Sequence, residues 1–170
     1  MGMPTELYIP EDRVQICRQR ISLRKEYVYG DRDQFPGRDI PRGKRAGRKA
    51  YAGQVFTQTG DLGVGKTVFT QGLAKGLGIE EPVNSPTFTI VQEYDGGRLP
   101  FYHFDVYRIG DVEEMEEVGF DDYVMGEGVS LIEWADLISE ILPEKRTEIL
   151  IEKDLERGFD YRRITVAQRE

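Results

Sequence analysis

One stretch of this 170-residue chain constrains its fold more than any other: Gly60-Asp61-Leu62-Gly63-Val64-Gly65-Lys66-Thr67. It has the pattern G-x-x-x-x-G-K-T of a phosphate-binding loop. The glycines allow the backbone to wrap around an anion and to point successive N–H groups at its oxygens. Lys66 is then placed to reach the β- and γ-phosphates of a nucleotide, and the Thr67 hydroxyl to bind Mg²⁺. The pattern therefore predicts a nucleotide site at residues 60–67.

The residues on either side of this loop have the periodicity that a phosphate-binding loop requires. Residues 54–59 have a composition compatible with a strand. Phe69, Leu73 and Leu77 recur every four residues, on one face of a helix. Gly78 suits the end of that helix. Strand, loop and helix in this order favour the motif over an ordinary glycine-rich turn.

Further strand and helix patterns follow this helix. Strands are predicted at 87–94, 99–104, 129–134, 147–152 and 162–166, and short helices at 112–118 and 136–142. The turn signal Asp95-Gly96-Gly97 joins the first two of these strands in a hairpin. We therefore expect one folded domain across residues 54–170.

Residues 1–53 have a different character. They hold 12 Lys and Arg against 7 Asp and Glu, a balance of +5, whereas residues 54–170 hold 11 against 24, a balance of −13. Five glycines, two prolines and a basic run at 42–49 leave no helical or strand period between residues 30 and 53. We expect a poorly patterned basic segment that is flexible or contacts RNA. A third hypothesis is that a shifted reading frame upstream of residue 54 produced it.

Composition excludes several function classes. The acidic balance of residues 54–170 argues against an autonomous nucleic-acid binder, so any connection to RNA is expected to run through a partner. No apolar run reaches membrane-spanning length and no signal segment opens the chain, so a cytoplasmic protein without a membrane partner is expected. The single cysteine, Cys17, and the single histidine argue against a disulfide, a Cys/His catalytic pair or a zinc site.

Two carboxylates are candidates for supporting a metal ion or a water beside the loop. Glu133 ends the apolar run 129–132, where phosphate-loop proteins place a second metal-supporting acid. Asp105 follows the strand 99–104 and is a candidate for orienting the nucleophilic water. The alternatives are a surface glutamate at a strand end, and an aspartate paired with Arg108.

Three other residues have a functional and a structural interpretation each. Thr87 lies in a loop that is suited to present a hydroxyl or carbonyl to a γ-phosphate, or it is a turn residue that starts a strand. His103 is a base or a half-buried strand residue. Trp134 stacks on a base or a partner, or it belongs to the core.

The nucleotide and the reaction class follow from absent motifs. Without an Asn-Lys-x-Asp guanine signature, ATP is the expected nucleotide. A small-molecule kinase needs an arginine-rich lid, and the only cations between the loop and Glu133 are Lys75, Arg98 and Arg108. An ATPase is therefore the first hypothesis, a small-molecule kinase the second, and a nucleotide-binding scaffold without hydrolysis the third.

Four motifs together resemble the TsaE family, also known as YjeE, the bacterial ATPases of tRNA threonylcarbamoyladenosine biosynthesis. They are residues 60–67, Val-Asn-Ser-Pro-Thr-Phe at 83–88, Tyr-His-Phe-Asp-Val-Tyr-Arg at 102–108 and Ile-Glu-Trp at 132–134. Order and spacing match the family over roughly residues 54–167. Glu114 and Gly119 also match a family E…G pair.

This resemblance implies a fold, an activity and partners. The fold is the α/β P-loop NTPase fold, with a mainly parallel sheet between helices and an antiparallel hairpin portion. The activity is Mg²⁺-dependent ATP hydrolysis, weak alone and stimulated by TsaB and TsaD, which modify adenosine 37 of tRNA, so tRNA is an indirect partner. By position, residues 60–67 bind ATP, Thr67 and Glu133 hold Mg²⁺, Asp105 supports the metal or water, and Thr87 lies in a switch-like loop.

The resemblance also assigns two residues outside these roles and leaves one region unmatched. Trp134 matches the tryptophan after the metal acid, and Arg162 is the best match for a C-terminal arginine that contacts the nucleotide, with Arg157 and Arg163 as alternatives. The chain departs from the family before residue 54, where no regular helix is expected. It also has Gln58 where the family's first strand has an apolar residue.

Overall fold

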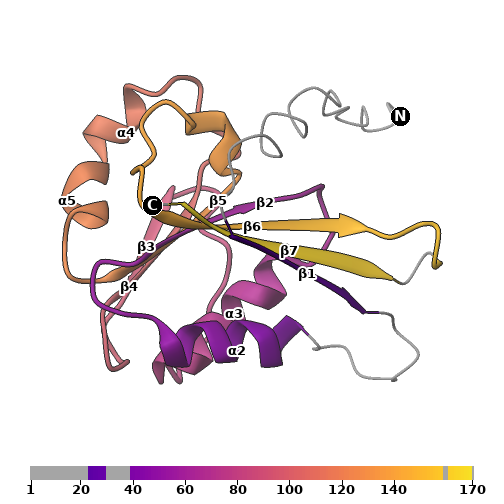
Figure 1. Ribbon diagram of the computed structural model, residues 1–170. Coiled ribbons are helices and arrows are strands. Elements are labelled where there is room, and N and C mark those ends of the chain that lie inside the picture. The colour runs from indigo at the N-terminus through magenta and orange to yellow at the C-terminus, as the bar shows by residue number, and fades with distance from the viewer. Residues whose placement is uncertain (1–22, 30–38, 159–160, 170) are drawn as a thin grey trace, which may run out of the picture.

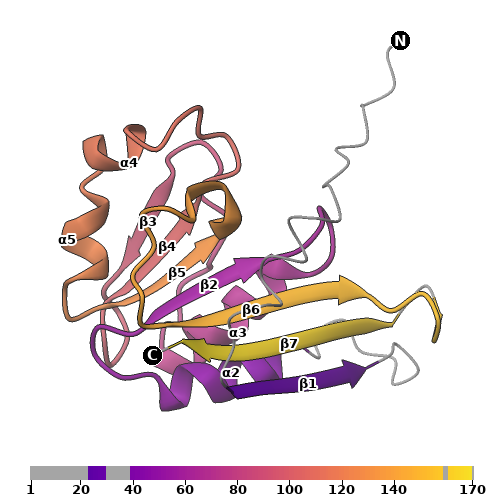
Figure 2. The same cartoon turned by 45° about the horizontal axis from the view of Figure 1, so that its top comes forward.

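The computed structural model describes residues 23–29, 39–158 and 161–169 of the chain. They form one seven-stranded sheet with helices on both faces (Figures 1 and 2). In spatial order the strands are β1 (Leu23–Tyr29), β7 (Arg162–Arg169), β6 (Arg146–Lys153), β2 (Val55–Thr59), β5 (Val129–Glu133), β4 (Phe101–Asp105) and β3 (Val91–Tyr94).

The centre of the sheet is parallel and its two edges are antiparallel. Strands β6, β2, β5 and β4 pair in parallel with one another. The outer pairs β1–β7, β7–β6 and β3–β4 are antiparallel. The predicted α/β fold with a parallel sheet and an antiparallel hairpin portion is therefore confirmed. The carboxyl ends of the central strands meet at one edge, where such sheets bind ligands.

Helices cover both faces of the sheet. On one face, α2 (Asp39–Lys49) and α3 (Lys66–Leu77) lie side by side (Figure 1). On the other face lie the short helices α4 (Glu114–Glu117) and α5 (Phe120–Val124) and the 3₁₀ turn η1 (Ala135–Ile138). In the described part of the chain, no helix is both long and apolar enough to cross a membrane.

The hydrophobic core is divided by the sheet into two clusters. Neighbouring residues of one strand belong to different clusters, because successive side chains point to opposite faces. Phe56 and Leu131 pack in the cluster with α3, and Val55 and Ile132 in the cluster with α5. Burial on both faces explains why these central strands are continuous apolar runs in the sequence.

The prediction that residues 30–53 contain no helix is wrong for α2. Pro41 lies in its first turn, where a missing N–H costs little. At its other end, the Arg98 guanidinium donates to the carbonyls of Gly47, at 2.5 Å, and Ala50, at 2.6 Å. This cation satisfies carbonyls near the helix end and complements its dipole. Residues 1–22, including Cys17, and 30–38 lie outside the described residues.

Glycines that resembled loop signals in the sequence instead bring α2 and α3 into backbone contact. A Cβ on Gly43 would lie 2.2 Å from the carbonyl oxygen of Phe69, and one on Gly47 would lie 2.1 Å from that of Leu73. On the facing helix, a Cβ on Gly76 would meet the carbonyl of Lys44 at 2.3 Å. Small residues four apart on each helix permit this approach, a pattern that periodicity of apolar residues does not detect.

Other element boundaries shift from the prediction for local reasons. The strand expected at 87–94 begins only at Val91, because Ile90 has a positive φ of 67°. The helix expected at 112–118 is the shorter α4, which ends before Gly119 as its sequence predicts; Gly119 has a φ of 74° and precedes α5. The helix expected at 136–142 is the shorter η1.

Candidate nucleotide-binding site

The loop at residues 60–65 joins β2 to α3 and needs glycine at three positions. Gly60, Gly63 and Gly65 have φ values of 148°, 72° and 110°. A Cβ on Gly60 would also lie 2.3 Å from the carbonyl oxygen of Ile151 in β6. Gly65 is the N-cap of α3 and supplies no side-chain hydrogen bond, so the first N–H groups of this helix face the loop. This cradle suits a phosphate group.

Lys66 is buried, with 6% of its surface exposed, and its ammonium lies within its own loop. Nζ donates to the carbonyls of Gly60, at 2.8 Å, and Asp61, at 2.7 Å. It also lies 3.9 Å from the centre of the Trp134 ring, a cation–π contact. Burial lowers the pKa of Lys66, and the nearby Glu133 carboxylate opposes this shift. Trp134 is thus a partner of the loop lysine, with 7% of its surface exposed.

Glu133 is buried at the carboxyl end of β5, so the alternative of a surface glutamate is wrong. Its Oε1 atom is 2.9 Å from His103 Nε2 and accepts a hydrogen bond from Thr70 at 3.2 Å. His103 is fully buried on β4, rather than half-buried as predicted. His103 on β4 and Thr70 on α3 therefore meet at one oxygen of Glu133.

Asp105 ends β4 next to Glu133, with which it pairs in register. Its Oδ2 atom accepts hydrogen bonds from the hydroxyls of Ser85 and, at 3.1 Å, Thr87, and Oδ1 accepts from the N–H of Tyr107 at 3.0 Å. The alternative pairing with Arg108 is not observed, because that guanidinium lies over the Phe88 ring at 5.0 Å. The structure therefore joins the loop of Thr87 to Asp105.

The three candidate arginines near the C-terminus have different neighbours. Arg162 Nε donates to the carbonyl of Val64 in the phosphate-binding loop, at 3.3 Å. Arg157 and Arg163 both lie beside the buried Asp154, at 3.8 and 3.1 Å. Arg162 is therefore the candidate that contacts the phosphate-binding loop.

The residues present fit a magnesium ion held together with a nucleotide. Thr67 lies on the first turn of α3, three residues before Thr70, which contacts Glu133. A hydroxyl and a carboxylate are oxygen ligands of the kind Mg²⁺ prefers, and this ion takes its remaining ligands from water and phosphate. Within the described ranges, no group of three or more His, Cys, Asp or Glu residues forms an all-protein metal site.

Gln58 and Thr70 contribute to this site and were not predicted. Gln58 is fully buried; its Nε2 donates to the carbonyl of Lys66 at 3.2 Å, and its Oε1 lies 3.2 Å from Thr70 Oγ1. Gln58 stands where an apolar residue is expected, and this departure is the only feature of the sequence that indicates a special role for it. Thr70, one turn after Lys66 on α3, had no signal of its own.

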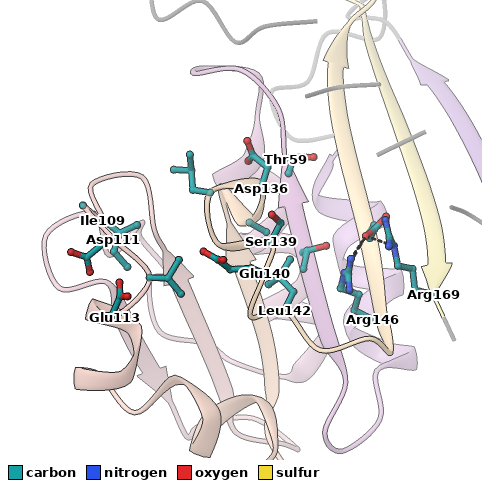
Figure 3. A pocket seen from close by; sticks show the side chains of 16 residues that line it. Thr59, Ile109, Asp111, Glu113, Asp136, Ser139, Glu140, Leu142, Arg146 and Arg169 are labelled. Carbon is teal, nitrogen blue, oxygen red and sulfur yellow. Dashed lines mark hydrogen bonds and ion pairs between the residues drawn. The ribbon is translucent and has the colours of Figure 1, made fainter. Parts of the chain in front are cut away.

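A separate cavity of about 610 Å³ opens beside η1, on the face of the sheet opposite α2 and α3 (Figure 3). Asp111 and Glu113 line it on one side and Arg146 and Arg169 on the other, with Asp136 and Glu140 between them. The two arginines share Glu148 Oε1, at 2.8 and 2.6 Å. None of the sequence-predicted site residues lines this cavity.

Comparison with known proteins relates the chain to one family. The family model described as threonylcarbamoyl adenosine biosynthesis protein TsaE matches residues 40–164. A curated relative, the tRNA threonylcarbamoyladenosine biosynthesis protein TsaE of Bacillus subtilis, is 55% identical over 116 residues, which are 68% of this chain and 70% of that protein. The protein of the same name from Treponema pallidum is 45% identical over 102 residues, 60% of this chain and 75% of its own length.

A solved structure has the same fold. The crystal structure of YdiB from Bacillus subtilis superposes with a TM-score of 0.71 and 40% sequence identity, over 88% of this chain and 89% of that one. The match to the family model begins within α2 and includes the phosphate-binding loop, Asp105, Glu133 and Arg162.

Proposed function

The chain belongs to the TsaE family, and from this premise we propose that it is a Mg²⁺-dependent ATPase that supports tRNA threonylcarbamoyladenosine biosynthesis. The observation that carries the proposal is the position of Glu133. Its buried carboxylate ends the strand beside β2, pairs in register with Gln58 and Asp105, and lies near the loop Lys66. Phosphate-loop ATPases need this combination of loop lysine and neighbouring-strand acid.

The loop and the lysine bind the phosphates of ATP. Backbone N–H groups of residues 60–67 donate to phosphate oxygens, with Asp61, Leu62 and Val64 contributing main chain only. Lys66 exchanges its two carbonyl partners for the β- and γ-phosphates, which are stronger acceptors because they are charged. Arg162 lies beside this loop and adds positive charge.

The remaining residues support hydrolysis. Thr67 and Glu133 would hold the magnesium ion, which supplies neutralisation of the charge that develops on the phosphate oxygens. His103 and Thr70 fix Oε1 of Glu133 and so orient its carboxylate. Asp105, with Thr87 and Ser85 bonded to it, accepts a hydrogen bond from the attacking water and orients it for in-line displacement.

TsaB and TsaD are the proposed partners, and tRNA is reached through their complex in the cytoplasm. The sparse lysines and arginines between the loop and Glu133 agree with slow hydrolysis by the chain alone. The test is phosphate release from ATP by the purified chain, with and without TsaB and TsaD. We expect weak release alone and faster release with both partners. Transfer of the γ-phosphate to a small molecule, or tight ATP binding without release in either setting, would contradict the proposal.

A further inference from the structure

We infer that the outer face of α2 binds the phosphate backbone of RNA directly. This basic face consists of Lys44, Arg45, Arg48 and Lys49. Direct contact goes beyond the proposed ATPase, whose link to tRNA runs through its partners. The choice of tRNA as the probe rests on the proposed function, whereas the choice of a polyanion rests on the geometry of α2.

The four side chains lie on a helix whose rotation about its own axis is fixed by its contact with α3. Their spacing places them together, and they line one surface pocket. The opposite side of α2 presents Gly43 and Gly47, whose backbone touches that of α3. Rotating α2 would drive side chains into α3, so the cations keep a fixed orientation toward solvent.

In the part of the chain that the structure describes, no acidic side chain pairs with the basic face. Arg45, Arg48 and Lys49 are exposed and Lys44 is half-buried. Among the described residues, none of the four takes part in an ion pair, and the sequence has no acidic residue between positions 40 and 60. The chain as a whole carries a net charge of −8. An approaching polyanion is therefore repelled by most of the surface and attracted to α2.

The chemistry of the basic face favours nucleic acid over a protein partner. Protein interfaces need an apolar centre and are depleted in lysine, yet the exposed residues of this face are all cationic. From residue 44 to 49 the helix extends about 7.5 Å, enough to follow about two successive phosphates of one strand. Tyr51, half-exposed just beyond the helix and 5.7 Å from Lys145 Nζ, offers a ring for base stacking.

The basic face lies away from the nucleotide site. Gly43 packs beside Phe69, and Gly47 beside Leu73 and Gly76, so α2 and α3 run in the same direction. The phosphate-binding loop is at the start of α3, whereas Arg48 and Lys49 lie beside its end. RNA and ATP are therefore expected to bind at the same time without competing.

The test is the binding of an unmodified tRNA transcript to the full chain, measured by fluorescence anisotropy at several salt concentrations. In the double variant Arg45→Gln/Arg48→Gln, two phosphate contacts are lost, so the slope of log K against log salt falls by roughly 1.4–1.8. The matched control Arg108→Gln/Arg157→Gln removes the same charge from exposed positions elsewhere and is expected to bind like the wild type. Binding of a fluorescent ATP analogue, unchanged in the double variant, separates this result from failure of the proposed function.

Three outcomes would overturn the inference. The first is absence of tRNA binding by the wild type at low salt, and the second is equal loss of binding in the double variant and its control. The third is unchanged tRNA binding with loss of TsaB–TsaD association in Arg45→Gln/Arg48→Gln, which would assign the basic face to an acidic protein surface. Lys44→Gln/Lys49→Gln is a second variant with the same expected loss of tRNA binding, and thermal unfolding checks that each variant is folded.

Discussion

The hydroxyl oxygen of Thr70 lies 3.2 Å from Oε1 of Glu133 and joins α3 to the end of β5. The same oxygen is 3.2 Å from Gln58 Oε1 and 3.1 Å from the carbonyl of Lys66. A threonine hydroxyl has one proton, so it donates to one of these three acceptors at a time. Gln58 therefore competes with the proposed metal ligand for a single buried donor.

This competition predicts a coupling between Gln58 and Thr70. Thr70→Val leaves Gln58 Oε1 without a donor in a fully buried place and is expected to lower the free energy of unfolding by about 1–3 kcal/mol. Adding Gln58→Leu removes that unpaired oxygen, so the double variant should recover much of the loss. Urea unfolding of the two single variants and the double variant measures the coupling. Additive losses would show that the two side chains act independently, and Thr70→Ser, which keeps the hydroxyl, is the control.

Glu133→Gln is expected to reduce Mg²⁺-dependent ATP hydrolysis by about 100-fold or more, because the amide keeps the shape and the Oε1 acceptor but removes the charge. Binding of ATP without Mg²⁺ should change little. Phosphate release and nucleotide titration, each with and without Mg²⁺, are the measurements. Wild-type turnover in Glu133→Gln would remove Glu133 from the metal site. Lys66→Ala, which removes the phosphate-binding ammonium, is the inactive reference.

Gly47→Ala is expected to destabilise the fold by about 1–3 kcal/mol, because the new methyl group would meet the carbonyl oxygen of Leu73 at 2.1 Å. Gly96→Ala is the matched control, since the nearest atom to its Cβ is a side-chain oxygen of Glu81 at 3.9 Å. Its effect should stay within about 0.5 kcal/mol. Thermal unfolding compares the two. Equal effects would mean that the contact between α2 and α3 adjusts freely.

The hydrogen bond between Tyr123 and Glu93 is expected to make the stability of the fold fall at alkaline pH. Its hydroxyl donates to Glu93 Oε1 at 2.6 Å, and this bond raises the pKa of Tyr123 from 10.0 to about 12. The folded protein thus holds this proton more tightly than the unfolded chain, so the stabilisation is complete below pH 10 and is lost as the pH rises towards 12. Urea midpoints of wild type and Tyr123→Phe should therefore converge in this range. A constant difference between them would contradict the assignment, and Tyr51→Phe is the exposed control.

The sequence predicted the parts of the site that depend on local pattern. The phosphate-binding loop, Thr87, Asp105 and Glu133 lie in motifs or at strand ends, and the structure brings these elements to one edge of the sheet. Their roles in chemistry stay predictions. The orientation of Asp105 toward Ser85 depends on a contact twenty residues apart, which no local pattern records.

What the sequence missed depends on tertiary contacts. The helix α2 has poor intrinsic preference and forms because glycine pairs bring it against α3 and because Arg98 binds its last carbonyls. Gln58 is polar in a buried strand, and its tolerance depends on partners from α3. Both the helix α2 and the buried Gln58 are unfavourable by local sequence alone, and both are stabilised by contacts with residues distant in the sequence.

The double hydrogen bond on Oδ2 of Asp105 decides which oxygen of this carboxylate is available to a water molecule. Ser85 and Thr87 together fill the acceptor capacity of that oxygen, so it cannot receive a water molecule while both hydroxyls remain. Oδ1 accepts one hydrogen bond, from the N–H of Tyr107, and keeps one lone pair for a further donor. In the proposed mechanism a water molecule would therefore meet Asp105 through the oxygen that faces Tyr107, and residues 85–87 would stay attached to the end of β4 meanwhile.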